Sequence, residues 1–556
     1  MSNPASGSVQ VGSLATEFSV ALLGQLIGRG LRDIVLCPGA RSQALALAAA
    51  AWEQQGRVRL RVRIDERVAG FLALGIAVET GRPVAVITTS GTAVANLHPA
   101  VLEAHHSGIP LILLTADRPV ELRGIGSNQT TDQVGMFGSA VGWVRDVAPP
   151  VDSVGAASLA EEAYAAAVGT PGPVQLNLSF REPLSGPVGG LPPIIDTGVA
   201  QGHALPARQI ANSPRTVVIA GHGAGPDAEA LARSLGVPLI AEVSSGSRFG
   251  PNLVGAYRQL LDDVEFGGQI KRAIVFGHPT LTRQVPALLT RSDVVVHVVR
   301  GPTSDAYNPG HRAASIDAAV THDGPTDDSP EGRTWLGSWV HSGRSILNAD
   351  AITPPAPDER PGDLAREQLA VFREPVTRRL LVESVWGVTW PHDRLVLGAS
   401  RLIREADACV PGKRIPVHAN RGLAGIDGTI ATAIGIALSS QDTDGGDSGI
   451  TRVLVGDLTA LYDVGALLFG GGEVRPRIQV IVGNDGGGTI FDGLEVAVTA
   501  PAISFDRVQY TPQSVDLRAL AAAYGWDYRV ARNRGELDEA LAASNNPTLV
   551  EVPLPR

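Results

Sequence analysis

Two short apolar segments, each followed at once by a polar cluster, constrain the fold of this chain more than any other feature. The segment 453–455 leads into Gly456-Asp457, and the segment 479–482 leads into a run of Asn, Asp and glycine at 483–488. An apolar stretch with a helical pattern joins them, which is typical of neighbouring strands in a parallel sheet. Because parallel strands end at one edge of a sheet, both polar clusters are expected at the carboxyl edge, where ligands bind.

The residues in these two clusters suit a hard divalent cation. Asp457 supplies a carboxylate, Asn484 and Asp485 supply further oxygen atoms, and glycines such as Gly487 expose backbone carbonyls. Mg²⁺ prefers oxygen ligands and commonly binds through one or two carboxylates together with substrate phosphates. An ordinary βαβ unit whose loops happen to be rich in Gly and Asp is the alternative interpretation.

Length, charge and cysteine content bound the class of protein. The 556 residues predict about three or four domains, and the net charge of −10 argues against a nucleic-acid or membrane partner, which needs a basic face. The two cysteines, Cys37 and Cys409, are too few to stabilise a chain of this length through disulfides, so a reducing cytoplasm is expected. The polar N-terminal stretch lacks the pattern of a signal peptide, and no apolar run approaches the ~18 residues of a membrane span.

Strand and helix patterns alternate in three blocks, which predicts an α/β fold of three domains at 1–190, 191–355 and 356–556, each a mostly parallel sheet flanked by helices. Pro- and Gly-rich stretches at 185–214 and 348–362 read as linkers. The strands expected in the three blocks are 34–37, 59–64, 84–88 and 111–115; then 216–220, 237–241, 273–276 and 293–298; then 395–397, 415–417, 453–455, 479–482 and 549–552. The helices expected in the first block are 43–52, 66–80 and 92–104.

Seven short polar strings occur in order along the chain. They are Cys37-Pro-Gly-Ala-Arg41-Ser42, Ile64-Asp-Glu66-Arg67, Thr89-Ser-Gly-Thr-Ala-Val-Ala-Asn96, Leu114-Thr-Ala-Asp-Arg118-Pro119, Gly126-Ser-Asn-Gln129-Thr130, Asn420-Arg421-Gly-Leu-Ala-Gly-Ile426-Asp427-Gly428 and Gly456-Asp-Leu-Thr459. Together with the Asn484-Asp485 loop they resemble the thiamine diphosphate-dependent decarboxylase and carboligase superfamily. This resemblance implies a thiamine diphosphate-binding fold with a pyrimidine-binding first domain, a middle domain, and a last domain for the diphosphate and metal.

The strings narrow the resemblance to the carboligases of menaquinone (vitamin K2) biosynthesis. These are transferases that decarboxylate 2-oxoglutarate and add the succinyl unit to isochorismate in a 1,4-addition. The implied cofactors are thiamine diphosphate and Mg²⁺ or Mn²⁺, and the implied assembly is a homodimer or a dimer of dimers. Two alternatives stay open: a relative in the superfamily that acts on small monocarboxylates, and a cofactor-binding protein without activity.

Glu66 is the catalytic residue that the resemblance implies. Thiamine diphosphate chemistry requires a carboxyl group that shares a proton with the pyrimidine N1′, and Glu66 follows a strand at the ligand-binding edge. The alternative is a favourable acid in the first turn of its helix. Ile426 is implied to support the bent cofactor. The full set of implied cofactor-binding residues is Glu66, Ser90, Gly91, Thr92, Asn96, Gly425, Ile426, Asp427, Gly456, Asp457, Leu458, Thr459, Asp485, Gly487, Gly488 and Ile490.

The implied metal ligands are Asp457, Asn484, Asp485 and the carbonyl of Gly487. Counting back from Ile490 favours Asp485 over Asn484, although an asparagine is commoner there in the superfamily. The carboxylates of both substrates would be bound by planar guanidinium groups, whereas a lone arginine is more often a surface ion-pair partner. The implied substrate-binding residues are Arg41, Arg118, Asn128, Gln129, Arg283, Ser400, Arg404, Arg421, Phe491 and Leu494.

Two further patterns are interpreted as structural. The glycines of the 221–225 string, Gly-His-Gly-Ala-Gly, do not have the spacing of a dinucleotide-binding loop, which favours a vestigial or structural turn. His105 and His106 lack further ligands nearby in the sequence, so a packing or surface pair is expected rather than a metal site.

Overall fold

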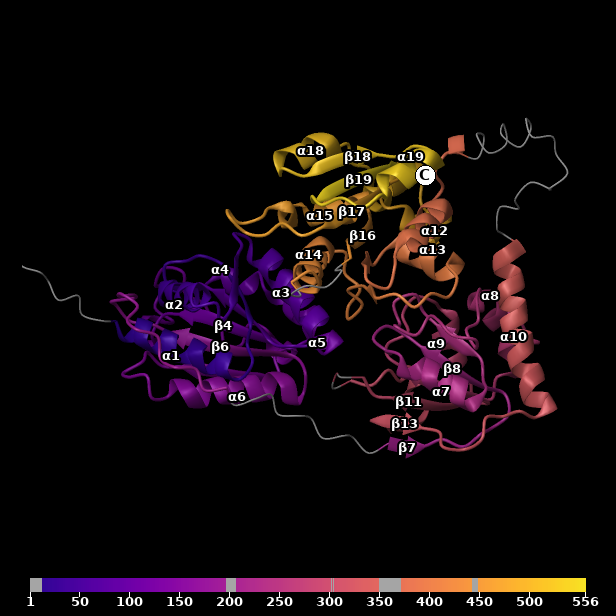
Figure 1. Ribbon diagram of the computed structural model, residues 1–556, viewed down its shortest axis with the longest axis horizontal. Helices are drawn as coiled ribbons and strands as arrows, with labels where there is room; N and C mark the ends of the chain where they lie inside the picture. Colours follow the sequence, from indigo (N-terminus) through magenta and orange to yellow (C-terminus); the bar gives the residue numbers. More distant parts are fainter. Residues whose placement is uncertain (1–12, 197–206, 302, 304, 350–371, 443–448) are drawn as a thin grey trace, which may run out of the picture. The chain divides into compact units, whose positions relative to one another are not determined.

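The structure is a computed structural model that describes residues 13–196, 207–301, 303, 305–349, 372–442 and 449–556 (Figure 1). The described residues form two compact units. The first comprises the described residues up to 196 with 434–439 and 468–474, and the second comprises the other described residues. None of the helices in these ranges is long and apolar enough to cross a membrane.

The first unit contains a six-stranded sheet with the strand order β2-β1-β3-β4-β6-β5. Its strands are β1 (Asp33–Leu36), β2 (Arg59–Val62), β3 (Val84–Thr88), β4 (Leu111–Asp117), β5 (Trp143–Val147) and β6 (Pro173–Ser179). Its helices are α1 (Leu14–Gly28), α2 (Gln43–Gln54), α3 (Glu66–Thr80), α4 (Thr92–Ala95), α5 (His98–Ser107) and α6 (Ala156–Gly169).

Helices cover both faces of this sheet, which explains why its central strands are apolar throughout (Figure 1). Ile34 and Leu36 of β1 belong to the core that α1, α2 and α6 share. Val35, which alternation places on the opposite face, is also fully buried. In the same unit, α3 and α5 pack so closely that a Cβ on Gly70 would lie 2.7 Å from the Cβ of Ala100.

The middle block forms a five-stranded sheet with the order β12-β11-β10-β8-β9, and a two-stranded sheet pairs β13 with β7. Trp335 and Trp339 of α10 pack into the core beneath the larger sheet. The strands are β7 (Ala207–Gln209), β8 (Thr216–Ala220), β9 (Leu239–Ala241), β10 (Arg272–Phe276), β11 (Val295–Val299), β12 (Ala313–Asp317) and β13 (Ala319–Thr321). The helices are α7 (Asp227–Leu235), α8 (Tyr257–Asp262), α9 (Gln284–Leu289) and α10 (Pro330–Ala349).

The last block forms a six-stranded sheet with the order β15-β14-β16-β17-β19-β18. Its strands are β14 (Arg394–Leu397), β15 (Val417–His418), β16 (Thr451–Gly456), β17 (Ile478–Asn484), β18 (Asp527–Val530) and β19 (Thr548–Pro553). Its helices are α12 (Arg378–Val388), α13 (Arg401–Cys409), α14 (Thr429–Ser440), α15 (Asp457–Tyr462), α16 (Val496–Thr499), α17 (Ala502–Phe505), α18 (Leu517–Ala523) and α19 (Arg534–Ala540).

The α/β class with mostly parallel sheets is confirmed, but two local expectations are wrong. The helix expected at 92–104 is broken between α4 and α5, where Pro99 lies in the first turn of a new helix. The connection between β16 and β17 is mostly irregular after the six-residue α15, because a glycine run at 470–472 interrupts any helix there. The three domain boundaries stay predictions. Most of the expected linker at 348–362, and residues 197–206 of the other, lie outside the described residues.

We predict that Gly70→Ala destabilises the protein. The new methyl group would overlap Ala100 of α5, and over-packing of this kind costs about 1–3 kcal/mol. Gly387→Ala is the matched control, because it lies on an exposed face of α12 with nothing within 4 Å of the added methyl group. The control should gain roughly 0.5–1 kcal/mol from lower backbone entropy in the unfolded chain. Scanning calorimetry of both variants tests this; an unchanged melting temperature for Gly70→Ala contradicts it.

Candidate active site

A cleft of about 110 Å³ lies at the carboxyl ends of β14, β16 and β17. It is the place where an open parallel sheet binds its ligand. Most of the residues implied for the diphosphate side line this one cleft, although they come from four separate segments of the chain. These residues are Ser400, Ile426, Gly456, Asp457, Leu458, Thr459, Asp485, Gly487, Gly488, Ile490 and Phe491.

Two buried carboxylates repel each other in the cleft. Asp457 is the first residue of α15 and is 5% exposed. Its burial, followed by the negative charge of Asp485, raises the pKa of Asp457 to about 6. A divalent cation between the two carboxylates would relieve both effects, so this donor set fits Mg²⁺ or Mn²⁺. Within the described residues no group of three or more His, Cys, Asp or Glu side chains could hold a metal.

The structure separates the roles of Asn484 and Asp485. Asn484 donates from Nδ2 to Glu551 Oε1 at 2.8 Å, and its Oδ1 accepts the amide of Gly486 at 3.3 Å. Asn484 is not among the residues that line the cleft, whereas Asp485 is. The loop is held from outside by Tyr510, whose hydroxyl donates to the Asp485 carbonyl at 2.7 Å. The geometry therefore favours Asp485 as the ligand, and the assignment stays a prediction.

Gly425, Asp427 and Leu494, like Asn484, are not among the residues that line the cleft. Gly425 and Asp427 form a tight turn, in which a Cβ on Gly425 would lie 2.2 Å from Asp427 Oδ1. This contact explains the glycine without a ligand. Leu494 is half-buried just after the 3₁₀ turn that carries Phe491.

Arg421 and Arg404 lie near a buried glutamate that the sequence did not single out. Arg421 is 2% exposed, and its Nε and Nη2 donate to Thr280 Oγ1 at 3.1 and 2.6 Å. Glu242 accepts the amides of Thr280 and Leu281, both at 2.7 Å, and so fixes the loop that holds Arg421. Its burial, followed by the charge of Asp407, raises the pKa of Glu242. The charge of Glu242 also acts on Arg404, whose Nη1 donates to the carbonyl of Ser400 at 2.8 Å.

Arg283 is not brought together with these arginines. Its side chain is 80% exposed and forms a 3.5 Å ion pair with Glu495. Exposed pairs of this kind contribute little to stability. In this structure Arg283 is a surface residue, and its role in substrate binding stays a prediction.

The first unit holds the other implied residues at the carboxyl edge of its own sheet. Arg118 donates from Nη1 to Ser90 Oγ at 2.7 Å and to the carbonyl of Gln129 at 2.9 Å. Gln129 adopts a positive φ of 59° and returns a hydrogen bond to the Ser90 carbonyl. Burial, followed by the charge of Arg118, lowers the pKa of Arg41, so the two guanidinium groups share one region. Glu182 and Asp117 act on Arg41 in the opposite direction. Two guanidinium groups in one region suit an anionic substrate.

Gly91 belongs to the same cluster, whereas other implied residues of this unit are less enclosed. The amide of Gly91 donates to the buried Gln133 side chain at 2.8 Å. Thr92, Asn96 and Asn128 are exposed. These three residues could contact a bound ligand, and within the described part of the chain no hydrogen bond or ion pair holds their side chains.

Glu66 begins α3 directly beyond the carboxyl end of β2. Asp65 caps the helix by accepting the amides of Arg67 and Val68 at 2.9 and 3.3 Å, so Glu66 is not needed as the cap. Burial, followed by the negative charge of Glu66, raises the pKa of the neighbouring Cys37 thiol. Glu66 thus lies at the ligand-binding edge beside a buried thiol, and its catalytic role stays a prediction.

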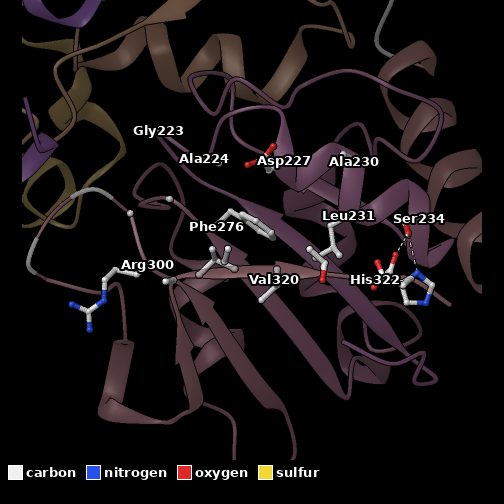
Figure 2. A pocket seen from close by; sticks show the side chains of 17 residues that line it. Gly223, Ala224, Asp227, Ala230, Leu231, Ser234, Phe276, Arg300, Val320 and His322 are labelled. Carbon is white, nitrogen blue, oxygen red and sulfur yellow. Dashed lines mark hydrogen bonds between the residues drawn. The ribbon is translucent and has the colours of Figure 1, made fainter. Parts of the chain in front are cut away.

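A second cavity, of about 580 Å³, lies at the carboxyl edge of the middle sheet (Figure 2). Its lining includes two acids, Asp227 and Asp323, and Arg300 lies at the opposite end from the hydrogen-bonded Ser234–His322 pair. An acid at the first position of α7 disfavours a dinucleotide phosphate there. Gly221 has a packing reason instead, because its Cβ would lie 2.0 Å from the nitrogen of Pro279. This contact supports the structural interpretation of the 221–225 string.

His105 and His106 form an edge-to-face ring pair, with centroids 5.0 Å apart, in the last turn of α5. Among the described residues they belong to no metal-binding group.

Comparison with known proteins agrees with the geometry of the site. Residues 17–136 match the family described as "Thiamine pyrophosphate enzyme, N-terminal TPP binding domain". The fold and this match define a thiamine diphosphate-dependent enzyme. Curated relatives extend the likeness over the whole chain, and three of them carry the name 2-succinyl-5-enolpyruvyl-6-hydroxy-3-cyclohexene-1-carboxylate (SEPHCHC) synthase.

The relative from Leifsonia xyli subsp. xyli is 58% identical over 100% of this chain and 98% of its own length. The relative from Clavibacter michiganensis subsp. michiganensis is 55% identical, with the same coverage of both chains. The relative from Kineococcus radiotolerans is 44% identical over 95% of this chain and 94% of its own length. The chain therefore belongs to the SEPHCHC synthase family.

Sequence reasoning missed several residues that line or support the site. Arg401 and Thr489 line the cleft, and Arg401 Nη1 donates to the Thr489 carbonyl at 3.1 Å. Arg378 contacts Asp485 and Thr280 contacts Arg421, in each case from a distant part of the chain. Glu242 in turn accepts the amide of Thr280. Thr489 adjoins the glycine loop and could have been found from its position. The other partners carried no local signal.

We predict that Asp457→Asn stabilises the metal-free protein at neutral pH. A carboxyl whose folded pKa of about 6 exceeds its ordinary value of 3.8 weakens folding as the pH rises through this range. Removing the charge should therefore contribute about 1–3 kcal/mol above pH 6. The difference should shrink as the pH falls below 6 and largely vanish only below 3.8, where the wild-type carboxyl is protonated in both states. Melting temperatures of the two apoproteins from pH 4 to 8 test this, and a variant that is less stable throughout contradicts it.

Proposed function

We propose that this chain is a SEPHCHC synthase in activity as well as in family. It would decarboxylate 2-oxoglutarate and add the succinyl unit to isochorismate, with thiamine diphosphate and Mg²⁺ or Mn²⁺ bound, as a step of menaquinone biosynthesis. The observation that supports this best is the cleft in which Asp457, Asp485 and the glycine loop meet beside Ile426. Family membership supports the substrates through the product named for the relatives.

Different residues of the chain would bind the metal, exchange a proton with the cofactor and bind the substrates. The bound cofactor supplies a nucleophilic carbon and an electron sink for decarboxylation. Asp457, Asp485 and the Gly487 carbonyl would hold the metal, while Glu66 would exchange a proton with the pyrimidine. Arg404 and Arg421 in one unit, and Arg41 and Arg118 in the other, would bind substrate carboxylates.

Phe491 lines the cleft with Asp457 and Asp485 and would give the isochorismate ring an apolar wall that excludes water. Pyrimidine-binding and diphosphate-binding residues belong to different units of the chain. We propose that a homodimer, alone or as half of a dimer of dimers, is the working form. The cytoplasm stays the proposed compartment, because both cysteines are buried and free.

A second enzyme of the same superfamily, acting on a small monocarboxylate, is the alternative function. Such an enzyme would gain nothing from arginines at both edges, because its substrate brings a single carboxylate. Turnover of 2-oxoglutarate and pyruvate, each with and without isochorismate, distinguishes the two. Preference for pyruvate would overturn the proposed substrates.

We predict that Glu66→Gln lowers kcat by about 100-fold or more, because general acid–base groups contribute roughly 10²–10⁴ to a rate. Folding should be unaffected, since Asp65 remains as the helix cap. Exchange of the reactive carbon-bound proton of thiamine diphosphate, followed by NMR, should slow to a similar extent. Glu79→Gln, near the other end of α3, is the matched control and should exchange normally. Substantial exchange in Glu66→Gln would remove this residue from catalysis.

We predict that Arg404→Ala raises the KM for 2-oxoglutarate or isochorismate by about tenfold or more, the loss expected for a charge-assisted contact. The affinity for thiamine diphosphate should change little, because Arg404 does not line the metal cleft. Arg414→Ala, whose guanidinium lies over the Phe249 ring, serves as the control. Steady-state kinetics and calorimetry separate the two effects; an unchanged KM for both substrates places Arg404 outside the substrate site.

A further inference from the structure

Arg378 forms a salt bridge with Asp485, one of the two carboxylates of the proposed metal site. Its Nε and Nη2 donate to Asp485 Oδ2 at 3.1 and 2.8 Å. The two side chains are 12% and 9% exposed, so water screens this pair far less than a surface pair. Arg378 lies about a hundred positions before Asp485, on α12, and no sequence pattern connects the two residues.

The two carboxylate oxygens of Asp485 differ in their hydrogen bonds. Oδ2 also accepts the hydroxyl of Thr489 at 2.5 Å, so three donors converge on this one atom. Among the described residues, no hydrogen bond reaches Oδ1. A carboxylate held by one oxygen in this way presents the other in a fixed direction, as partners of metal ligands commonly do.

The placement of Arg378 is unfavourable for its own helix. It is the first residue of α12, where the helix dipole disfavours a positive charge. Helix formation therefore does not explain a buried arginine at this position. The nearby carboxylate does, because the ion pair compensates both the dipole and the loss of hydration.

We propose that Arg378 is a positioning residue that orients Asp485 and cancels its charge where Mg²⁺ and the cofactor diphosphate bind. This inference rests on the proposed function. Two uncompensated carboxylates would attract a bare cation but repel a diphosphate. With Arg378 in place, the Asp485–Arg378 pair is neutral and acts electrostatically as a neutral amide ligand would. The site thus favours the metal and diphosphate together over the metal alone.

A double-mutant cycle tests the pairing, with Arg378→Gln, Asp485→Asn and the double variant compared with the wild type. The affinity of the apoprotein for thiamine diphosphate is measured by calorimetry at saturating Mg²⁺, and the affinity for Mg²⁺ alone is measured separately. Arg378→Gln should weaken diphosphate binding about tenfold without weakening Mg²⁺ binding. Asp485→Asn should weaken Mg²⁺ binding about tenfold, since it leaves Arg378 uncompensated. The double variant should lose less affinity for the cofactor than the two single losses multiplied together would give.

Arg379→Gln is the matched control, because this adjacent arginine pairs with Glu383 at 2.8 Å on its own helix. Its cofactor affinity should equal that of the wild type. Melting temperatures of all variants identify losses that come from unfolding. If all variants are folded and the losses of cofactor affinity in the two single variants multiply in the double variant, the proposed pairing is wrong. A wild type that binds no thiamine diphosphate with Mg²⁺ overturns the proposed function instead, and the two failures are therefore distinguishable.

Discussion

Parallel pairing of the strands is the constraint on which the rest of this structure depends. Every named strand pairing is parallel, in all of the sheets. Each strand of a sheet therefore ends at the same edge, and the following loop begins there. This brings Ser400, Asp457 and Asp485 together although β14, β16 and β17 are far apart in the sequence. The same rule places Glu66 and Ser90 at one edge of the first sheet.

The fold was largely predictable because covered parallel strands are short, apolar and bounded by polar loops. The expected strands at 84–88 and 216–220 coincide with β3 and β8, and the expected helix at 66–80 coincides with α3. The α1 helix and the β5 and β6 strands were missed. α1 is apolar on nearly every side because it is buried against two other helices, so it shows little amphipathic pattern. The pattern is equally weak at β5, because this strand is largely exposed and the helix that follows it, α6, is rich in alanine.

The sequence predicts which residues lie together where a polar residue directly follows a strand, although their roles stay predictions. Asp457 and Asp485 directly follow strands, so their meeting in the cleft follows from topology. The partners that orient the functional groups follow from tertiary packing alone. Glu242 holds the loop of Thr280, and Thr280 holds Arg421, across separations that no local pattern encodes. Arg283 shows that a matching sequence context does not fix exposure, since its side chain is 80% exposed while its role in substrate binding stays a prediction.

The buried, repelling carboxylate of Asp457 has a consequence for the abundance of the protein. A site that weakens the empty fold makes its ligands into stabilisers, since a ligand that binds only the native state adds roughly 2.7 kcal/mol at a hundred times its Kd. Empty molecules would open more often and meet proteases more readily than loaded ones. If thiamine diphosphate is the ligand, cellular vitamin supply would control how long each copy of the enzyme survives, independently of how fast it works.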